Sequence, residues 1–273
     1  MAEPTIERRE LTVMQRPARV HVGGAGSALL LIHGAWGRAA MHWSRVWGAL
    51  ARRHRVVAPE LPGLGDPEVP APASVRGYVA WLSALLDQLG VDRAVCVGNS
   101  FGASVVWSLA GRAPERCAGL VLVNGVPMPA TPPLLAFVGA TRWGQALMRA
   151  LLRRLAYHPG ALKKAFVDLQ AAPVDALRPL LAARGAELVP RLAELLIAGD
   201  GPPEPRVAPL LLWGAEDRLI GTGARDARAL HARLARSELA LIPGAGHFPQ
   251  LEAPDVFVET LERFVARQAP PAR

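Results

Sequence analysis

Cysteine is scarce in this sequence, with two residues among 273, which excludes a small scaffold held together by disulfides. Long hydrophobic runs are also missing. No stretch approaches the roughly 18 consecutive apolar residues that a membrane span needs, and the N-terminal residues lack the apolar segment of a secretion signal. We therefore expect a cytoplasmic protein without a membrane partner. Cys96 and Cys117 lie in apolar runs and are expected to be buried thiols.

Hydrophobic residues nevertheless make up 51% of the chain, which is enough to bury a substantial core and excludes a disordered protein. Lysine and arginine outnumber aspartate and glutamate by 31 to 23, for a net charge of +8. The basic residues are scattered, in short pairs at most, and no known nucleic-acid-binding motif accompanies them. We expect no nucleic-acid partner.

Strand-like and helix-like segments alternate along most of the chain. Short apolar runs are typical of strands buried on both faces, and their alternation with helical segments predicts right-handed crossovers and a mostly parallel sheet. The expected fold class is α/β, with a twisted eight-stranded sheet and helices on both faces. The expected strands are 11–16, 19–23, 28–33, 55–58, 93–97, 120–123, 210–213 and 239–242, and the expected helices are 41–52, 74–89, 103–111, 224–235 and 254–267.

The alternation stops between residues 127 and 204, where only helix-like segments occur. Proline-rich joints flank this stretch, and a loop of such length without secondary structure would be unusual. We expect two units: a core of residues 1–126 and 205–273, and an inserted helical cap of residues 127–204. The helices expected in the cap are 134–155, 161–170, about 174–183, and 187–198.

A serine flanked by glycines lies between an expected strand and an expected helix. The segment Gly98-Asn-Ser-Phe-Gly102 matches the pattern Gly-x-Ser-x-Gly, in which the serine occupies a tight strand-to-helix turn that exposes its hydroxyl group. The glycines give the backbone the room for such a turn. Ser100 is therefore a candidate nucleophile; the alternative is a plain turn with a capping serine.

A serine nucleophile needs a base and a group that orients the base. His247 follows the last expected strand, and Asp217 follows the strand before it, so both belong to the edge of the sheet where parallel strands end and ligands bind. The order serine, acid, histidine is the one expected with this turn. Glu216 is the alternative acid and is expected to face solvent. Five other histidines are expected to pack or lie at the surface: His21, His42, His54, His158 and His231.

The loop that begins at His33 is expected to supply part of an oxyanion hole. With this type of turn, one backbone N–H comes from that loop and the other from the residue after the nucleophile. We assign the two donors to Ala35 and Phe101. The substrate-binding candidates are Trp36, Asn99, Phe137, Trp143 and Phe248.

Taken together, the His33 loop, the serine turn, Asp217 and His247 resemble the α/β-hydrolase superfamily over nearly the whole chain. The resemblance implies a serine hydrolase with a cap inserted after the sixth strand. The turn that starts at Glu60, Glu-Leu-Pro-Gly-Leu-Gly, resembles the family's Asp-x-Pro-Gly-x-Gly turn with Glu in place of Asp. Ser100 argues against the haloalkane dehalogenases and epoxide hydrolases of this superfamily, which use aspartate as the nucleophile.

The residue before the nucleophile points to one subgroup. Asn99 resembles the Gly-Asn-Ser-x-Gly segment of the meta-cleavage-product hydrolases, which cleave carbon–carbon bonds. Those enzymes usually carry His-Gly-x-Gly-Pro-Gly in the oxyanion loop and a tryptophan after the catalytic histidine. This chain instead has His33-Gly-Ala-Trp-Gly-Arg38 and Phe248, so the resemblance to the subgroup is partial.

The expected function is the hydrolysis of a carboxylic ester through an acyl-enzyme. The alternatives are a carbon–carbon bond hydrolase, a thioesterase or acyltransferase, and a non-catalytic binding protein on the same fold. The expected partners are a small-molecule acyl substrate and water, with the chain a monomer or homodimer. We expect no cofactor and no metal, because the sequence has neither a Cys-x-x-Cys pair nor a His-Glu-x-x-His motif.

Overall fold

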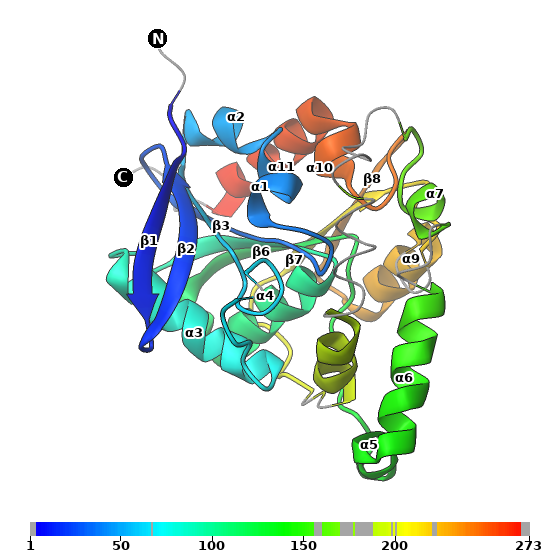
Figure 1. Ribbon diagram of the computed structural model, residues 1–273. Helices are drawn as coiled ribbons and strands as arrows, with labels where there is room; N and C mark the ends of the chain where they lie inside the picture. Colours follow the sequence, from blue (N-terminus) through cyan, green and yellow to red (C-terminus); the bar gives the residue numbers. More distant parts are fainter. Residues whose placement is uncertain are drawn as a thin grey trace.

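A single twisted sheet organises the molecule (Figure 1). The computed structural model describes residues 4–66, 68–155, 160–169, 177, 188–197, 199, 201–219 and 223–268. The strand order is β1-β2-β4-β3-β5-β6-β7-β8, and all neighbours from β4 to β8 run parallel. The strands are β1 (Glu7–Val13), β2 (Arg16–Gly23), β3 (Ala28–Ile32), β4 (Arg55–Pro59), β5 (Ala94–Asn99), β6 (Cys117–Val123), β7 (Pro209–Gly214) and β8 (Glu238–Ile242). The expected eight-stranded, mostly parallel sheet is confirmed.

Helices cover both faces of this sheet, and the alternation of side chains along β3 shows why both faces are apolar. Leu30 and Ile32 pack into one buried cluster with α3 (Val75–Gln88) and α4 (Phe101–Arg112). Leu29 and Leu31 pack into a second cluster on the other face, formed with α1 (Ala39–Trp43), α2 (Trp47–Ala51) and α11 (Pro254–Gln268). Figure 1 shows the two layers of helices on opposite sides of the strands. A strand enclosed in this way has to be apolar at every position.

The N-terminal hairpin differs from its expected form. The sequence analysis ended the first strand at Arg16, whereas β1 and β2 meet in a two-residue turn at Met14 and Gln15, and Val13 pairs with Arg16. Both turn residues have positive φ angles, 50° and 61°. Such a turn matches the right-handed twist of the strands, and neither residue type signals it, since glycine and asparagine are the usual occupants.

Several helices also differ from expectation in their limits. The single helix expected over 41–52 is the pair α1 and α2. The helix expected over 74–89 is confirmed as α3, and the side chain of Ser74 caps it by accepting a hydrogen bond from the Gly77 N–H at 3.2 Å. The helices near the C-terminus are α9 (Ala224–Arg233), α10 (Pro249–Glu252), which the sequence analysis missed, and α11.

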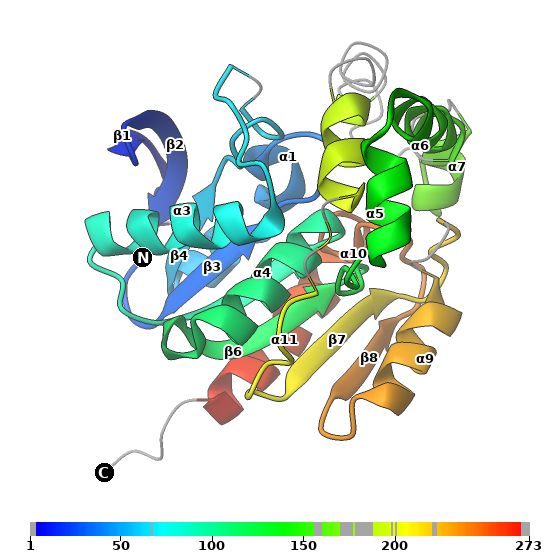
Figure 2. The ribbon, with the colours of Figure 1, turned by 90° about the horizontal axis from the view of Figure 1, so that it is seen from below.

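Between β6 and β7 the described residues form helices and no strand. These are α5 (Pro133–Ala140), α6 (Arg142–Leu155), α7 (Ala161–Ala165) and a helix of residues 188–197. The one long helix expected over 134–155 is divided at Thr141, whose hydroxyl group accepts a hydrogen bond from the Gly144 N–H at 3.1 Å. The helix expected near 174–183 lies outside the described residues except for Leu177. Viewed from below, these helices stand beyond the ends of β6 and β7 (Figure 2).

Because Leu31 is fully buried between helices, Leu31→Ala is expected to lower the free energy of unfolding by about 2–5 kcal/mol. Val256 on α11 is 46% exposed, and Val256→Ala should change that free energy by less than about 0.5 kcal/mol. Urea unfolding followed by circular dichroism measures both. Equal losses in the two variants would contradict the described packing.

Candidate active site

The backbone at Ser100 is strained, and its neighbours hold it in that state. Ser100 has φ 55° and ψ −119° at the junction of β5 and α4, a conformation that L-residues rarely adopt. Two close backbone approaches surround it. A Cβ atom added at Gly98 would lie 2.2 Å from the Gly102 carbonyl oxygen, and one added at Gly102 would lie 2.4 Å from that of Ile32. Only glycine permits these contacts, which press α4 against β5 and β3.

The acid and base candidates meet at the carboxyl ends of β7 and β8. Nδ1 of His247 lies 2.7 Å from Oδ2 of Asp217, and both side chains are buried. A carboxylate at Nδ1 keeps the proton on that nitrogen and leaves Nε2 as the basic atom of the neutral ring. The pair therefore has the arrangement that a general base and its orienting acid require.

Asn124 orients the acid, a role that the sequence analysis missed. Its Nδ2 donates to Oδ2 of Asp217 at 2.8 Å, and its Oδ1 accepts the Gly214 N–H at 2.9 Å. The other oxygen of Asp217 accepts the Leu219 N–H at 2.9 Å. Asn124 follows β6 directly. Its position at the end of the strand next to β7 is the sequence signal that could have identified this role.

The His33 loop passes directly beside the candidate nucleophile. A Cβ atom added at Gly34 would lie 2.9 Å from Cβ of Ser100. His33 holds the loop in place: its Nδ1 donates to the Gly34 carbonyl at 2.7 Å, and its Nε2 accepts the Leu61 N–H at 2.9 Å. Ala35 and Phe101, the expected oxyanion donors, follow Gly34 and Ser100 in the chain, so the loop and the turn bring the two segments together.

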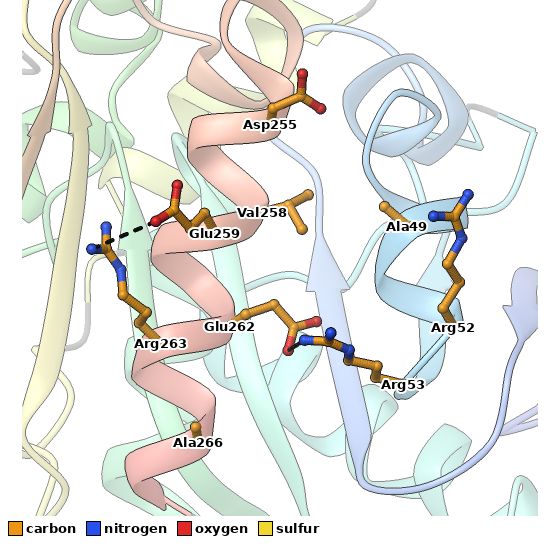
Figure 3. Close-up of a pocket in the computed structure, with 9 residues that line it drawn as sticks. All are labelled: Ala49, Arg52, Arg53, Asp255, Val258, Glu259, Glu262, Arg263 and Ala266. Carbon is orange, nitrogen blue, oxygen red and sulfur yellow. Dashed lines mark ion pairs between the residues drawn. The ribbon is translucent and has the colours of Figure 1, made fainter.

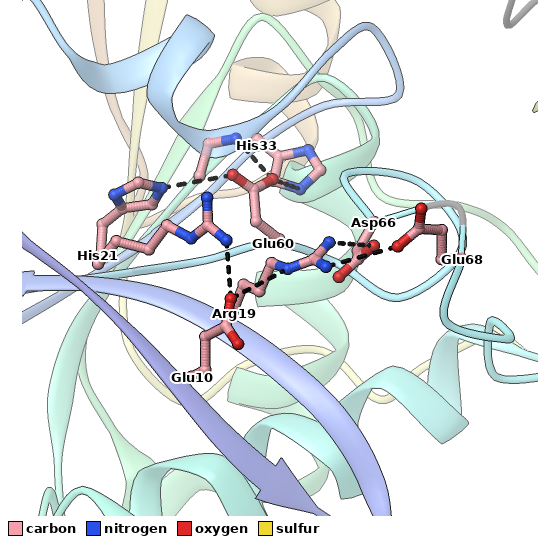
Figure 4. Close-up of polar contacts among 9 residues, drawn as sticks. Glu10, Arg19, His21, His33, Glu60, Asp66 and Glu68 are labelled. Atoms are coloured by element: carbon pink, nitrogen blue, oxygen red, sulfur yellow. Dashed lines mark hydrogen bonds and ion pairs between the residues drawn. The ribbon is translucent and has the colours of Figure 1, made fainter.

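The Glu60 turn supports the same loop from below (Figure 4). The carboxylate of Glu60 accepts the Ala39 N–H at 3.0 Å and lies 3.5 Å from Nε2 of His21. Burial raises the pKa of Glu60, but the His21 hydrogen bond, the electrostatic effect of the nearby His33 ring and the Ala39 N–H outweigh it and lower that pKa below its ordinary value. Further along the turn, Arg19 contacts Asp66 at 2.8 Å.

His42, expected to be a packing residue, is buried at the centre of the site. Its Nε2 lies 2.6 Å from the Trp36 carbonyl oxygen, and its Nδ1 lies 2.9 Å from Oδ1 of Asn99. Asn99 in turn donates from Nδ2 to the carbonyl oxygens of Val123, at 3.0 Å, and His247, at 3.2 Å. These two side chains therefore connect the His33 loop, the serine turn and the His247 loop.

Burial governs the charge of His42. Removal from water and, to a smaller extent, the neighbouring His33 lower its pKa to about 3, although the hydrogen bonds to Trp36 and Asn99 oppose the change. The ring is therefore neutral in the folded protein near pH 7.

Aromatic side chains gather beside the histidine. The ring of Phe248 lies edge-on to His247 at 5.0 Å and stacks on Phe166 at 4.8 Å, and Trp36 lies 6.4 Å from His247. Trp36, Phe166 and Phe248 belong to one buried cluster. The two remaining substrate-binding candidates, Phe137 and Trp143, are outside this cluster, on α5 and α6, with exposures of 73% and 86%.

The segment around α7 contacts the loops of Asp217 and His247 through the backbone. The Ala165 carbonyl accepts the His247 N–H at 2.5 Å, and the Lys164 carbonyl accepts the Arg218 N–H at 3.0 Å. Glu252 links the same parts, because its carboxylate accepts N–H groups from Val167 at 2.7 Å and from the glycine before His247 at 2.8 Å. The helices inserted between β6 and β7 are thus bonded to the loops that carry the acid and the base.

The described residues show no metal-binding group of three or more His, Cys, Asp or Glu side chains, and among them no helix has the length and hydropathy to cross a membrane. A groove of about 540 Å³ lies between α2 and α11 (Figure 3). Two ion pairs lie within it, Arg263 with Glu259 at 3.7 Å and Arg53 with Glu262 at 3.9 Å. None of the triad candidates lines the groove, so it is separate from this site.

Comparison with known proteins places the chain among hydrolases. Residues 29–260 match the Alpha/beta hydrolase family. A 2-hydroxymuconate semialdehyde hydrolase of Pseudomonas sp. (strain CF600) is 30% identical over 94% of this chain and 93% of its own. A pimeloyl-[acyl-carrier protein] methyl ester esterase of Aromatoleum aromaticum is 32% identical over 86% of this chain and 98% of its own.

A solved structure of similar fold is the 2-hydroxy-6-oxo-6-phenylhexa-2,4-dienoate hydrolase from Rhodococcus sp. strain RHA1. It is 25% identical, with a TM-score of 0.70 over 96% of this chain and 99% of its own. A thermophilic esterase from Thermogutta terrifontis has the same fold, with a TM-score of 0.73 at 19% identity over 97% of this chain and 100% of its own.

The low pKa of His42 predicts a loss of stability in acid. Between its ordinary value of 6.5 and about 3, the unfolded chain binds a proton at this residue and the folded chain does not. The free energy of unfolding should therefore fall as pH decreases through this window, by at most about 1.4 kcal/mol per pH unit from this group. His42→Gln should reduce the slope measured by urea unfolding at pH 4–7. The matched control is His231→Gln at an exposed position, and equal slopes in both variants would contradict the prediction.

Proposed function

Since the chain belongs to the α/β-hydrolase family, we propose that it is a serine hydrolase in which Ser100, His247 and Asp217 form the catalytic triad. The observation that carries this proposal is the strained turn at Ser100, with φ 55° between β5 and α4, at the edge of the sheet where Asp217 holds His247. Such strain persists where the surrounding structure enforces it, and it is typical of functional sites.

In the proposed mechanism, Nε2 of His247 takes the proton from Oγ of Ser100 as the oxygen attacks the carbonyl carbon of the substrate. Asp217, held by Asn124, keeps the imidazole ring oriented and stabilises its positive charge. The backbone N–H groups of Ala35 and Phe101 stabilise the oxyanion of the tetrahedral intermediate.

The leaving group departs with the proton from His247, which leaves an acyl group on Ser100. Water, deprotonated by the same histidine, then attacks this ester and releases the acid. The proton taken from water passes from His247 to Oγ of Ser100 as the acyl bond breaks, which restores both residues, so the chemistry needs no group beyond the triad, the two N–H donors and water.

A carboxylic ester is the substrate class that we propose first. The rings beside His247, those of Trp36, Phe166 and Phe248, form an apolar surface that favours an uncharged acyl group. The 32% identity to the methyl ester esterase from Aromatoleum aromaticum supports an ester substrate. A thioester differs only in its leaving group.

We propose that residues 127–204 form a cap over the site, because α7 and the residues after it pack on these rings and bond to the triad loops.

Carbon–carbon bond hydrolysis is the second candidate, and the same triad would serve it. Asn99 before the nucleophile and the 30% identity to a 2-hydroxymuconate semialdehyde hydrolase over nearly the whole chain favour it. Asn99 is fully buried and bonded to His42, Val123 and His247. We therefore propose that it positions the site, in place of the substrate-binding role expected from the sequence.

Ser100→Ala should abolish turnover without unfolding the protein. The residual rate should fall by at least about a thousandfold, because removal of a triad nucleophile leaves only the catalysis that comes from binding and the oxyanion hole. The assay uses p-nitrophenyl esters of short and medium chain length, with fluorophosphonate labelling in parallel. Ser83→Ala on α3 is the matched control. A labelled, active Ser100→Ala variant would refute the triad.

The same preparations distinguish the two substrate classes. Ester turnover without loss of a yellow ring-fission dienolate chromophore would support the esterase, and the reverse would support the carbon–carbon hydrolase. Labelling of Ser100 with neither activity would point to a thioester or to a narrower acyl group.

Asp217→Asn should lower kcat by about a thousandfold or more and leave KM nearly unchanged, because the amide favours the wrong tautomer of His247. Glu216→Gln, the neighbouring acid, is the control and should keep kcat within about twofold. The readout is the pH dependence of kcat and KM with the best ester. A larger loss in Glu216→Gln would transfer the role of the acid to Glu216.

A further inference from the structure

The arm formed by α5 and α6 (residues 133–155) exposes an apolar surface. In the described part of the chain ten large hydrophobic side chains are exposed, and seven of them belong to this arm. Figures 1 and 2 both place the two helices at the periphery of the molecule. Concentrated apolar exposure of this kind marks a surface that meets a partner. The seven are Leu134, Leu135, Phe137, Val138, Trp143, Leu147 and Leu151.

The apolar side chains form a continuous stripe along α6. Trp143, Leu147 and Leu151 are spaced four residues apart, so they lie one above another on one side of the helix. Their exposures are 86%, 72% and 46%. Leu152, on another side of the helix, packs against the core cluster. The orientation of α6 is therefore set by the core, with its apolar stripe directed outward.

The charge of this surface distinguishes it from an ordinary protein–protein contact surface. No aspartate or glutamate occurs between Glu115 and Asp168. Over the same stretch α6 carries four arginines, and two lysines follow on α7. Arg142, Arg149 and Arg153 are spaced seven and four residues apart, so they share one side of α6, about 140° around the helix axis from the apolar stripe. Arg142 and Arg153 are exposed, and Arg149 is half-buried. The arm is thus apolar and purely basic.

A helix with an exposed apolar stripe, a tryptophan and flanking arginines is suited to the interface of an anionic lipid layer. The long arginine side chains reach phosphate groups while the apolar stripe enters the acyl region. A second copy of the chain is disfavoured, because a symmetric contact would bring the same basic surfaces together without an acid between them. The 14 residues of α6 extend only about 21 Å, so the helix would lie in the plane of the layer.

We propose that this arm docks the protein on an anionic lipid surface, with Phe137, Trp143 and Leu147 inserted and the arginines of α6 bound to phosphate groups. The sequence analysis expected no membrane partner, and the proposal replaces that expectation. It is independent of the proposed catalytic function, because no triad residue takes part.

The buried state of Cys96 and Cys117 makes a direct test possible. Leu147→Cys supplies one accessible thiol for an environment-sensitive nitrobenzoxadiazole dye, and Val256→Cys on α11, also at an exposed apolar position, is the matched control. The labelled proteins are mixed with vesicles of phosphatidylcholine alone or of phosphatidylcholine with phosphatidylglycerol. We expect a blue-shifted, stronger emission from position 147 alone, with the anionic vesicles alone, and its loss in 0.5 M NaCl.

Sedimentation with the same vesicles measures affinity without a label. Phe137→Asp should reduce binding to anionic vesicles by about tenfold or more, whereas Val256→Asp should leave it unchanged. Circular dichroism confirms that both variants are folded. No emission change at position 147, equal binding to both vesicle types, or equal loss in the two aspartate variants would overturn the proposal. So would an emission change that depends on protein concentration without vesicles, which would identify a second copy as the occupant.

Discussion

The close backbone contact between β5, α4 and β3 is the constraint on which the site depends. Gly98 and Gly102 allow the start of α4 to approach both strands more closely than any side chain would permit, and the backbone of Ser100 is held in its positive-φ conformation between them. The same packing places the His33 loop against Ser100. Relaxing this contact would therefore move Ser100, the proposed nucleophile, and the expected oxyanion donors together.

Buried polar groups fix the other elements of the site relative to this turn. Asn99 and His42 connect the turn to the His33 loop and to the backbone of His247, and Asn124 connects the ends of β6 and β7 to Asp217. Because unpaired polar groups are costly in a dry interior, a network of this kind favours a single arrangement of the loops. The carbonyl groups of α7 extend it into the helices between β6 and β7.

Most of the fold was predictable because its signals are local. The apolar runs of β3, β5 and β7, the cap of α3 by Ser74 and the glycines around Ser100 are all visible over a few residues. The predicted limit of the first strand was wrong, because neither Met14 nor Gln15 signals a hairpin turn. Features that depend on distant contacts were not visible, since His42 shows no difference in sequence from any other packing histidine. Its importance follows from burial beside Asn99, which lies 57 positions away in the chain.

The sequence by itself determined the α/β class, the order of the elements and the candidate residues Ser100, Asp217 and His247, because periodicity, glycine placement and chain order are properties of short segments. Only the tertiary structure decided which side chains meet. The parallel sheet brings the ends of β5, β6, β7 and β8 to one edge, and this places Asn124 on Asp217 and His42 on Asn99. Tertiary packing also directs the apolar stripe of α6 outward instead of toward the site, since the contact of Leu152 with the core sets the rotation of that helix.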